Sequence, residues 1–199
     1  FFSFKDTDGL TFESAYGMLC MKLAFAFQDY QFLLDDDAIS DDDKGIFKRI
    51  LGRTASMDET KSCFLLLTRM LEIHFKKSAV VILDEYDVPI AKASSNGYYS
   101  QMLDVMRAMM STTLKDNTSL DFAVVTGCLK IAKESIFTGT NNFVSDTILS
   151  PRLSESFGFT QADVDQMLKD ADLESQSAEI KAWYDGYHFG DADIYCPWD

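Results

Sequence analysis

The sequence contains little proline, few cations and no cysteine framework. Only three of its 199 residues are proline, and 18 Lys and Arg stand against 32 Asp and Glu, which gives a formal net charge of −14. A chain this acidic lacks the broad positive surface that binds nucleic-acid phosphates, so no direct nucleic-acid binding is expected. The four cysteines are scattered, with neither CxxC spacing nor a paired pattern. They indicate buried thiols in a reduced, cytoplasmic protein.

Long apolar runs are also missing. The longest mostly apolar stretch extends from Met18 to Phe27 and is interrupted by Lys22. It has about half the length that a helix needs to cross a bilayer, so no membrane association is predicted. The chain opens on Phe1-Phe2-Ser3-Phe4 without an initiator Met, which is typical of a strand and not of a signal peptide. We therefore expect the chain to be part of something longer, truncated at its N-terminal side.

The composition that is present predicts a globular protein. Apolar residues make up 47% of the chain and 16 of them are Phe, enough for one sizeable core. Three short apolar runs predict strands at Phe1 to Phe4, Val80 to Leu83 and Phe122 to Val125. These runs do not alternate with polar residues, so both faces of the sheet should be covered. Long crossovers between them predict an α/β fold with a mainly parallel sheet.

Helices are expected between these strands and after them. The segment after Asn96-Gly97 has apolar residues at helical spacing from Tyr99 to Leu114, and its methionines are interpreted as core. Residues 88–97 are interpreted as a loop, and Phe143 to Leu149 is a candidate for one more strand. The other predicted helices begin at the caps Thr11, Ser40 with Asp43, Ser56 with Glu59, and Thr160 with Asp163.

Two parts of the chain are distinguished. Residues 1–150 are predicted to form the α/β core. Residues 151–199 are predicted to be a small helical and aromatic-rich extension of the same domain, in which Trp183 to Trp198 forms a packed loop or a small hairpin.

The first candidate for chemistry is the end of the second strand, where an apolar run is followed directly by Asp84-Glu85. This is the Walker B arrangement, in which a rigid strand fixes an Asp for Mg²⁺ and the neighbouring Glu polarises a water for attack on a γ-phosphate. Ligands of open parallel sheets bind beyond the carboxyl ends of the strands, which is where this pair lies. The alternative is that the acidic pair simply ends a buried strand as it reaches solvent.

The next strand ends in Thr126, a candidate polar sensor beside the γ-phosphate or the attacking water. Because parallel neighbouring strands bring their carboxyl ends together, Asp84, Glu85 and Thr126 are predicted to cluster at one edge of the sheet. Lys130 and Lys133 follow in a chain where cations are scarce, and a cation there could stabilise the charge of a transferring phosphoryl group. The alternative is that both lysines only pair with the acidic surface.

The phosphate-binding half of such a site is absent from the sequence. A P-loop requires GxxxxGK[ST], whose backbone N–H groups cradle the phosphates and whose Lys reaches the β and γ oxygens. None of the ten glycines begins or completes this motif.

Five stretches of the sequence, which are spread over nearly the whole chain, resemble the AAA-ATPase-like domain family. The members of this family are P-loop ATPases that often have a C-terminal nuclease-like module. The similar stretches are FFSFKDTDGLTFESAYGML, AVVILDEYDVPI, FAVVTGCLKIAKESIFTGTNNF, FGFTQADV and WYDGYHFGDADIYCPW. They occur in the family's order over nearly the whole chain. In this family a Walker A loop precedes the segment that resembles FFSFKD.

The resemblance implies a three-layer P-loop NTPase-like sandwich that lacks its P-loop strand here. It also implies that Asp84 associates with Mg²⁺, that Glu85 is the catalytic glutamate and that Thr126 is the sensor, with Lys130 and Lys133 as less securely placed phosphate-facing cations. Mg²⁺ and ATP are the implied cofactors of the intact protein, but neither is expected to stay bound to this segment. A homo-oligomer or a protein partner is compatible with the family.

Two hypotheses follow. In the first, the chain contributes the Walker B and sensor half of an Mg-ATP hydrolysis site and is inactive alone because Walker A is absent. In the second, it is a catalytically inactive interaction module of the same fold, with the acidic surface and the aromatic C-terminal part as contact faces. The intact Asp84-Glu85 pair and Thr126 favour the first.

Overall fold

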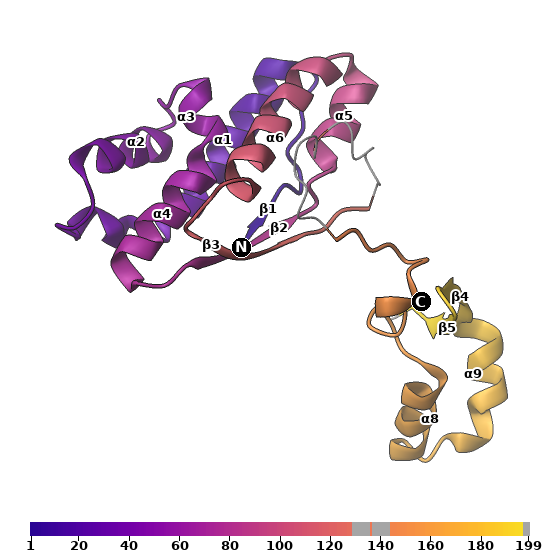
Figure 1. Ribbon diagram of the computed structural model, residues 1–199. Coiled ribbons are helices and arrows are strands. Elements are labelled where there is room, and N and C mark those ends of the chain that lie inside the picture. The colour runs from indigo at the N-terminus through magenta and orange to yellow at the C-terminus, as the bar shows by residue number, and fades with distance from the viewer. Residues whose placement is uncertain (129–135, 137–143, 197–199) are drawn as a thin grey trace. The chain divides into compact units, whose positions relative to one another are not determined.

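The computed structural model describes residues 1–128, 136 and 144–196 (Figure 1). The chain forms two compact units, residues 1–141 and 142–199, and each unit is described by itself. Whether the second unit is an extension of one domain that begins at residue 151 remains a prediction.

The first unit is built on a three-stranded parallel sheet. Its strands are β1 (Phe2–Ser3), β2 (Ala79–Asp84) and β3 (Leu120–Val125), in the order β1-β2-β3. Ser3 is level with Asp84, and Leu83 is level with Val125. The three strand predictions and the parallel α/β class are thereby confirmed.

The helices of the first unit agree with most of the predicted start signals. The Thr11 hydroxyl accepts a hydrogen bond from the Ser14 N–H at 3.3 Å, and the Ser56 hydroxyl does the same for Glu59 at 3.2 Å. Such caps satisfy N–H groups that have no partner within the first helical turn. The helical elements are α1 (Phe12–Gln28), η1 (Gln31–Asp35), α2 (Asp41–Leu51), α3 (Met57–Lys61), α4 (Cys63–Phe75), α5 (Val88–Asn96) and α6 (Tyr99–Leu114).

The interpretation of residues 88–97 as a loop was wrong, because α5 occupies most of this segment. Pro89 lies in its first turn, where the missing N–H of proline costs no helical hydrogen bond. Gly97 ends the helix with a φ of 84°, a left-handed conformation that glycine adopts without strain.

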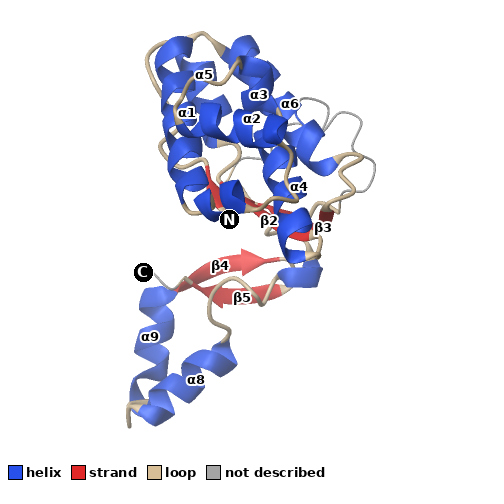
Figure 2. Cartoon of the chain, turned by 90° about the vertical axis from the view of Figure 1, so that its left-hand side faces the viewer, coloured by secondary structure: helices blue, strands red, loops and turns tan. Residues whose placement is uncertain are grey.

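One face of the sheet packs against helices, and Figures 1 and 2 show α1, α4 and α6 gathered on one side of the strands. Helix α4 contacts β2, and α6 contacts β3. The methionines of α6 are part of this core, as predicted. The fully buried side chains of this unit include Phe4, Leu19, Leu23, Phe27, Phe47, Met70, Leu83, Met102, Met106 and Met109.

The other face of the sheet is exposed in the part of the chain that the structure describes. Side chains alternate between the two faces of a strand, and on β2 Val80 and Ile82 are exposed while Val81 and Leu83 are buried. On β3, Phe122 is 61% exposed and Val124 is also exposed. The expected cover on both faces is therefore not found among the described residues, and the third layer of the sandwich stays a prediction.

The second unit contains a helical pair and an antiparallel hairpin. Thr160 and Asp163 form the predicted capping box, and Val164, Leu168 and Tyr195 form a small core. The predicted hairpin is present as β4 and β5, which pair antiparallel. Its elements are η2 (Pro151–Leu153), α8 (Gln161–Asp170), η3 (Glu174–Gln176), α9 (Ser177–Tyr184), β4 (Asp185–Phe189) and β5 (Ala192–Tyr195).

The candidate strand at Phe143 to Leu149 is not formed where the structure describes it. Residues 144–147 have no regular structure and residues 148–149 form a turn, while Phe143 lies outside the described residues. A strand needs a neighbour to pair its backbone groups, and apolar residues alone do not supply one.

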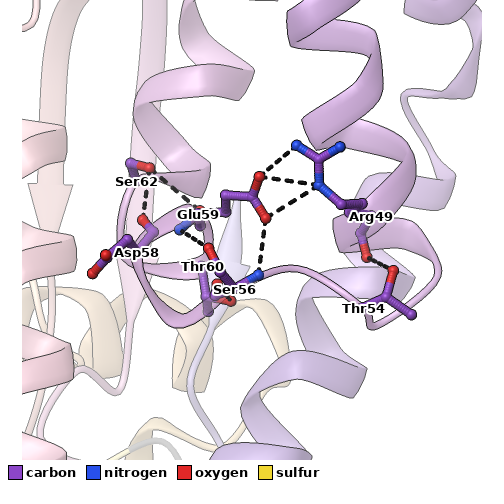
Figure 3. Close-up of polar contacts among 7 residues, drawn as sticks. All are labelled: Arg49, Thr54, Ser56, Asp58, Glu59, Thr60 and Ser62. Carbon is purple, nitrogen blue, oxygen red and sulfur yellow. Dashed lines mark hydrogen bonds and ion pairs between the residues drawn. The ribbon is translucent and has the colours of Figure 1, made fainter.

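An ion pair joins α2 to the start of α3 (Figure 3). Arg49 Nε and Nη2 donate to Glu59 Oε1 at 3.0 and 2.5 Å, and the Ser56 N–H donates to Glu59 Oε2 at 2.8 Å. Glu59 thus closes the capping box and binds Arg49 with the same carboxylate. The hydrogen bonds from Arg49, and then that from Ser56, lower the pKa of Glu59 to about 2.

The ion pair between Arg49 and Glu59 should contribute to the stability of the protein in a pH-dependent way. The pKa of Glu59 is lower in the folded protein, so its contribution is complete above about pH 4.5 and is lost as the pH falls toward about 2. We expect Glu59→Gln to destabilise the protein near neutral pH, and the difference from the wild type to shrink across this window in urea unfolding. In an Arg49→Met background the pH-dependent difference should be much smaller; a difference of unchanged size would contradict the assignment to this pair.

Candidate functional site

Three polar residues form one row across the carboxyl edge of the sheet. Ser3 on β1 is level with Asp84 on β2, and Thr126 directly follows the Val125 that is level with Leu83. The ladder continues past the strands, because the Thr126 N–H donates to the Leu83 carbonyl at 2.9 Å. Level residues on parallel strands project to the same face, so the three side chains share the face of the exposed Ile82 and Val124.

The centre of the row is the Asp84 carboxylate. The Thr126 hydroxyl donates to Asp84 Oδ1 at 2.5 Å. Asp84 is half-buried and Thr126 is exposed, so the pair is open to a ligand. The sequence predicted that these two residues meet, and the structure brings them together.

Ser3 was not predicted as a site residue. Its Oγ lies 3.5 Å from Asp84 Oδ2 and accepts the Lys5 N–H at 3.2 Å. The Phe4 N–H donates to the Asp84 carbonyl at 2.9 Å, so the backbone of β1 is also fixed to this position. The only signal in the sequence was a serine inside an aromatic run, which gives no indication of what it faces.

Glu85 is placed by an unusual backbone conformation. Its φ is 54°, in the left-handed region that few non-glycine residues adopt, and its carbonyl accepts the Val88 N–H at 3.1 Å. Such conformations cost free energy and are concentrated at functional sites. Glu85 is half-buried and lies in the sharp turn that directly follows Asp84, at the carboxyl edge of the sheet. Its backbone conformation and its place at this edge are both typical of a functional residue.

Glycine at position 127 lets the chain after β3 lie against the chain after β2. A Cβ at this position would lie 2.4 Å from Asp87 Oδ1 and 2.8 Å from the ring of Tyr86, both of which are buried. The Tyr86 N–H donates to the Thr126 carbonyl at 3.2 Å across the same contact. Gly127 thus permits the close approach that keeps Thr126 beside Asp84.

Lys130 and Lys133, the predicted phosphate-facing cations, lie outside the described residues. Within the described ranges, no three His, Cys, Asp or Glu side chains are grouped so as to hold a metal ion. Two aspartates of the acidic segment between η1 and the first turn of α2 are engaged in structural contacts, since Asp43 pairs with Arg69 and Asp36, which directly follows η1, lies 2.8 Å from His74 Nδ1.

Two of the four cysteines, Cys20 and Cys63, lie in environments that disfavour a reactive thiol. Burial raises the pKa of both thiols, which disfavours the reactive thiolate, although the hydrogen bonds of Cys20 with Tyr16 and Thr60 act in the opposite direction. All four cysteines are free, as the sequence analysis expected. Only Cys63 is fully buried, and Cys128 is exposed, so the interpretation of all four as buried thiols was wrong.

A family model described as "Predicted AAA-ATPase" matches residues 2–137, which is more than half of the chain and includes Ser3, Asp84, Glu85 and Thr126. The chain belongs to this family. The resemblance that the sequence analysis noted is thereby confirmed.

One relative of this AAA-ATPase-like chain is an "uncharacterized protein in vnfD 5′ region" from Azotobacter chroococcum mcd 1. It is 30% identical over 155 residues, which are 77% of this chain and 30% of the relative. The chain thus matches less than a third of that protein's length. No solved structure matches the chain significantly. Among the residues described, the AAA-ATPase-like chain has no helix with the length and hydropathy that a bilayer crossing needs.

The donor set at the sheet edge of the AAA-ATPase-like chain fits Mg²⁺. This ion prefers oxygen ligands, keeps several waters and is commonly held by one or two carboxylates together with substrate phosphates. Asp84 and Glu85 supply carboxylate oxygens for such an ion. The hydroxyls of Thr126 and Ser3 are directed to the Asp84 carboxylate, with Thr126 donating to Oδ1 and Ser3 lying 3.5 Å from Oδ2.

Proposed function

We propose that the AAA-ATPase-like chain contributes the metal and water side of an Mg-ATP hydrolysis site. The observation that supports this most strongly is the 2.5 Å hydrogen bond between Thr126 and Asp84 at the carboxyl ends of neighbouring parallel strands. This is the place where ligands of parallel α/β sheets bind. Asp84 would hold the metal, and Glu85 would polarise the attacking water. Thr126 would orient Asp84 and, as the polar sensor, accept a hydrogen bond from the attacking water beside the γ-phosphate.

Each role follows from the chemistry of the side chain. A metal bound at Asp84 would neutralise the charge on the phosphate oxygens. Glu85 has a carboxylate that can accept a proton from water. Its left-handed backbone conformation turns the chain away from the direction of β2. Thr126 has one proton, which it donates to Asp84, and its lone pairs remain available to a further donor. Lys130 and Lys133 are proposed as phosphate-facing cations on the sequence alone.

The proposed site needs a P-loop that the 199 residues do not contain, because the motif GxxxxGK[ST] is missing from them. Residues 1–199 should therefore bind Mg-ATP weakly or not at all, while a longer form of the protein that includes such a loop upstream should bind and hydrolyse it. Calorimetric titration with Mg-ATP and a steady-state phosphate assay compare the two. Tight Mg-ATP binding by residues 1–199 would contradict this division of the site.

A second function is supported by a different observation. The exposed apolar face of the sheet, which comprises Val80, Ile82, Phe122 and Val124, is of the kind that packs against another segment or another protein. An interaction module without nucleotide chemistry would use such a face. The polar row at its edge favours the ATPase, because packing alone does not require Asp84 and Thr126 to meet there.

A further inference from the structure

The Asp84 carboxylate is approached by a hydroxyl on each of its two oxygens. Thr126 reaches Oδ1 from the β3 side, and Ser3 lies 3.5 Å from Oδ2 on the β1 side. The two hydroxyls come from strands that lie on opposite sides of β2. A carboxylate held on both oxygens is fixed in χ1 and χ2, whereas one held on a single oxygen can still turn about that contact.

The direction of the Ser3 proton follows from its other contact. A serine hydroxyl has one proton to donate and lone pairs to accept with. Ser3 Oγ accepts the Lys5 N–H at 3.2 Å, which fixes the oxygen and leaves its proton for Asp84 Oδ2. The contact is long for a hydrogen bond, but polar contacts in active sites are commonly long before a ligand is bound.

We propose that Ser3 is a positioning residue that holds the Asp84 carboxylate from β1 in the orientation that receives Mg²⁺. This inference rests on the proposed function for the role of Asp84 toward the metal. Ser3 itself touches neither water nor nucleotide in this proposal, and it acts only through Asp84. The strand register places it there, since Ser3 and Asp84 are level in the β1-β2 pair.

The first test uses residues 1–199 without metal or nucleotide. Three-bond couplings to the Asp84 carboxyl carbon, measured by NMR, report whether the side chain occupies one χ1 rotamer. We expect one dominant rotamer in the wild type and in Ser3→Thr, which keeps the hydroxyl, and rotamer averaging in Ser3→Ala. Ser100→Ala, at an exposed position on α6, is the control and should not change the couplings.

The second test uses the longer, P-loop-containing protein. Ser3→Ala should raise the Mg²⁺ concentration for half-maximal ATP hydrolysis by about two- to ten-fold, which corresponds to the loss of one hydrogen bond. The Michaelis constant for ATP at saturating Mg²⁺ should stay near the wild-type value. Ser3→Thr should restore most of the Mg²⁺ dependence. A loss of general stability would lower activity at every Mg²⁺ concentration and would not be repaired at saturation.

The outcomes separate this inference from the function on which it rests. If Asp84→Asn alters the Mg²⁺ dependence while Ser3→Ala leaves both the rotamer and the Mg²⁺ dependence unchanged, the role of Ser3 is refuted and the proposed function stands. If Ser3→Thr behaves like Ser3→Ala, the hydroxyl is not what matters and the inference fails. If Asp84→Asn has no effect on the Mg²⁺ dependence, the proposed function fails and the metal-directed role of Ser3 fails with it.

Discussion

Replacing Glu85 with Gln in the longer protein should lower ATP turnover by about 10²- to 10⁴-fold, the usual contribution of a general base. Gln has nearly the size of Glu and keeps a hydrogen-bonding group, but its amide does not accept a proton from water. The left-handed backbone at position 85 is unchanged by this substitution, so the turn after β2 should remain. Affinity for Mg-ATP should therefore stay close to that of the wild type.

Asp84→Asn should behave differently because Asp84 is proposed to hold the metal. Its amide can still interact with the Thr126 hydroxyl, but the negative charge that attracts Mg²⁺ is lost. We expect weaker Mg²⁺-dependent nucleotide binding together with lower turnover, so this variant should change both binding and the chemical step.

Calorimetric titration and steady-state hydrolysis of the two variants distinguish these roles. Glu13→Gln, in the exposed first turn of α1, is a matched control that should leave both measurements unchanged. Wild-type turnover by Glu85→Gln would make the interaction module the better hypothesis. Equal losses of nucleotide affinity in both variants would contradict the proposal that Asp84 holds the metal while Glu85 only activates water.

The parallel sheet and the meeting of Asp84 with Thr126 could be predicted from local patterns. Each apolar run ends abruptly in polar residues, and the parallel arrangement that follows from long crossovers places those ends at one edge. The prediction needed only the ends of the strands and not their exact register. For this reason it is correct for two residues that are 42 positions apart.

Ser3 could not be found in the same way. Its place beside Asp84 depends on the register of β1 against β2, and no residue in the run Phe1 to Phe4 fixes that register in the sequence. By contrast, α5 had recognisable signals, because proline in the first turn and glycine just after the last turn are typical helix boundaries.

The exposed face of the sheet shows a limit of reasoning from apolar patterns. An unalternating run such as Val80 to Leu83 indicates that both faces are suited to burial, but it does not identify the segments that bury them. In the described part of the chain α4 and α6 supply the cover on one face only. Residues 144–149 likewise show that apolar residues alone do not make a strand, since residues 144–147 have no regular structure and residues 148–149 form a turn.

The largest loss of stability is expected from Phe4→Ala, because Phe4 links β1 to the core. Its side chain is fully buried, and its ring centroid lies 4.9 Å from that of Phe2 and 6.4 Å from that of Phe64. Removing a buried phenylalanine ring typically costs about 3–5 kcal/mol, from lost burial and the cavity that remains. The hydrogen bond from the N–H of residue 4 to the Asp84 carbonyl is not removed directly, so the loss reports mainly on the ring.

Phe1→Ala is the matched control for this substitution, because Phe1 is 74% exposed and three positions away. It should change the free energy of unfolding by less than about 0.5 kcal/mol. Urea unfolding followed by far-ultraviolet circular dichroism makes the comparison, because most of the described helices, α1 to α6, belong to the first unit. Tryptophan fluorescence would report on the second unit, since both tryptophans belong to it. Similar losses in the two variants would mean that Phe4 is not the anchor of β1. A selective loss in Phe4→Ala would mean that the buried Phe4 ring, and not the aromatic run as a whole, stabilises the packing of the β1 segment on the core.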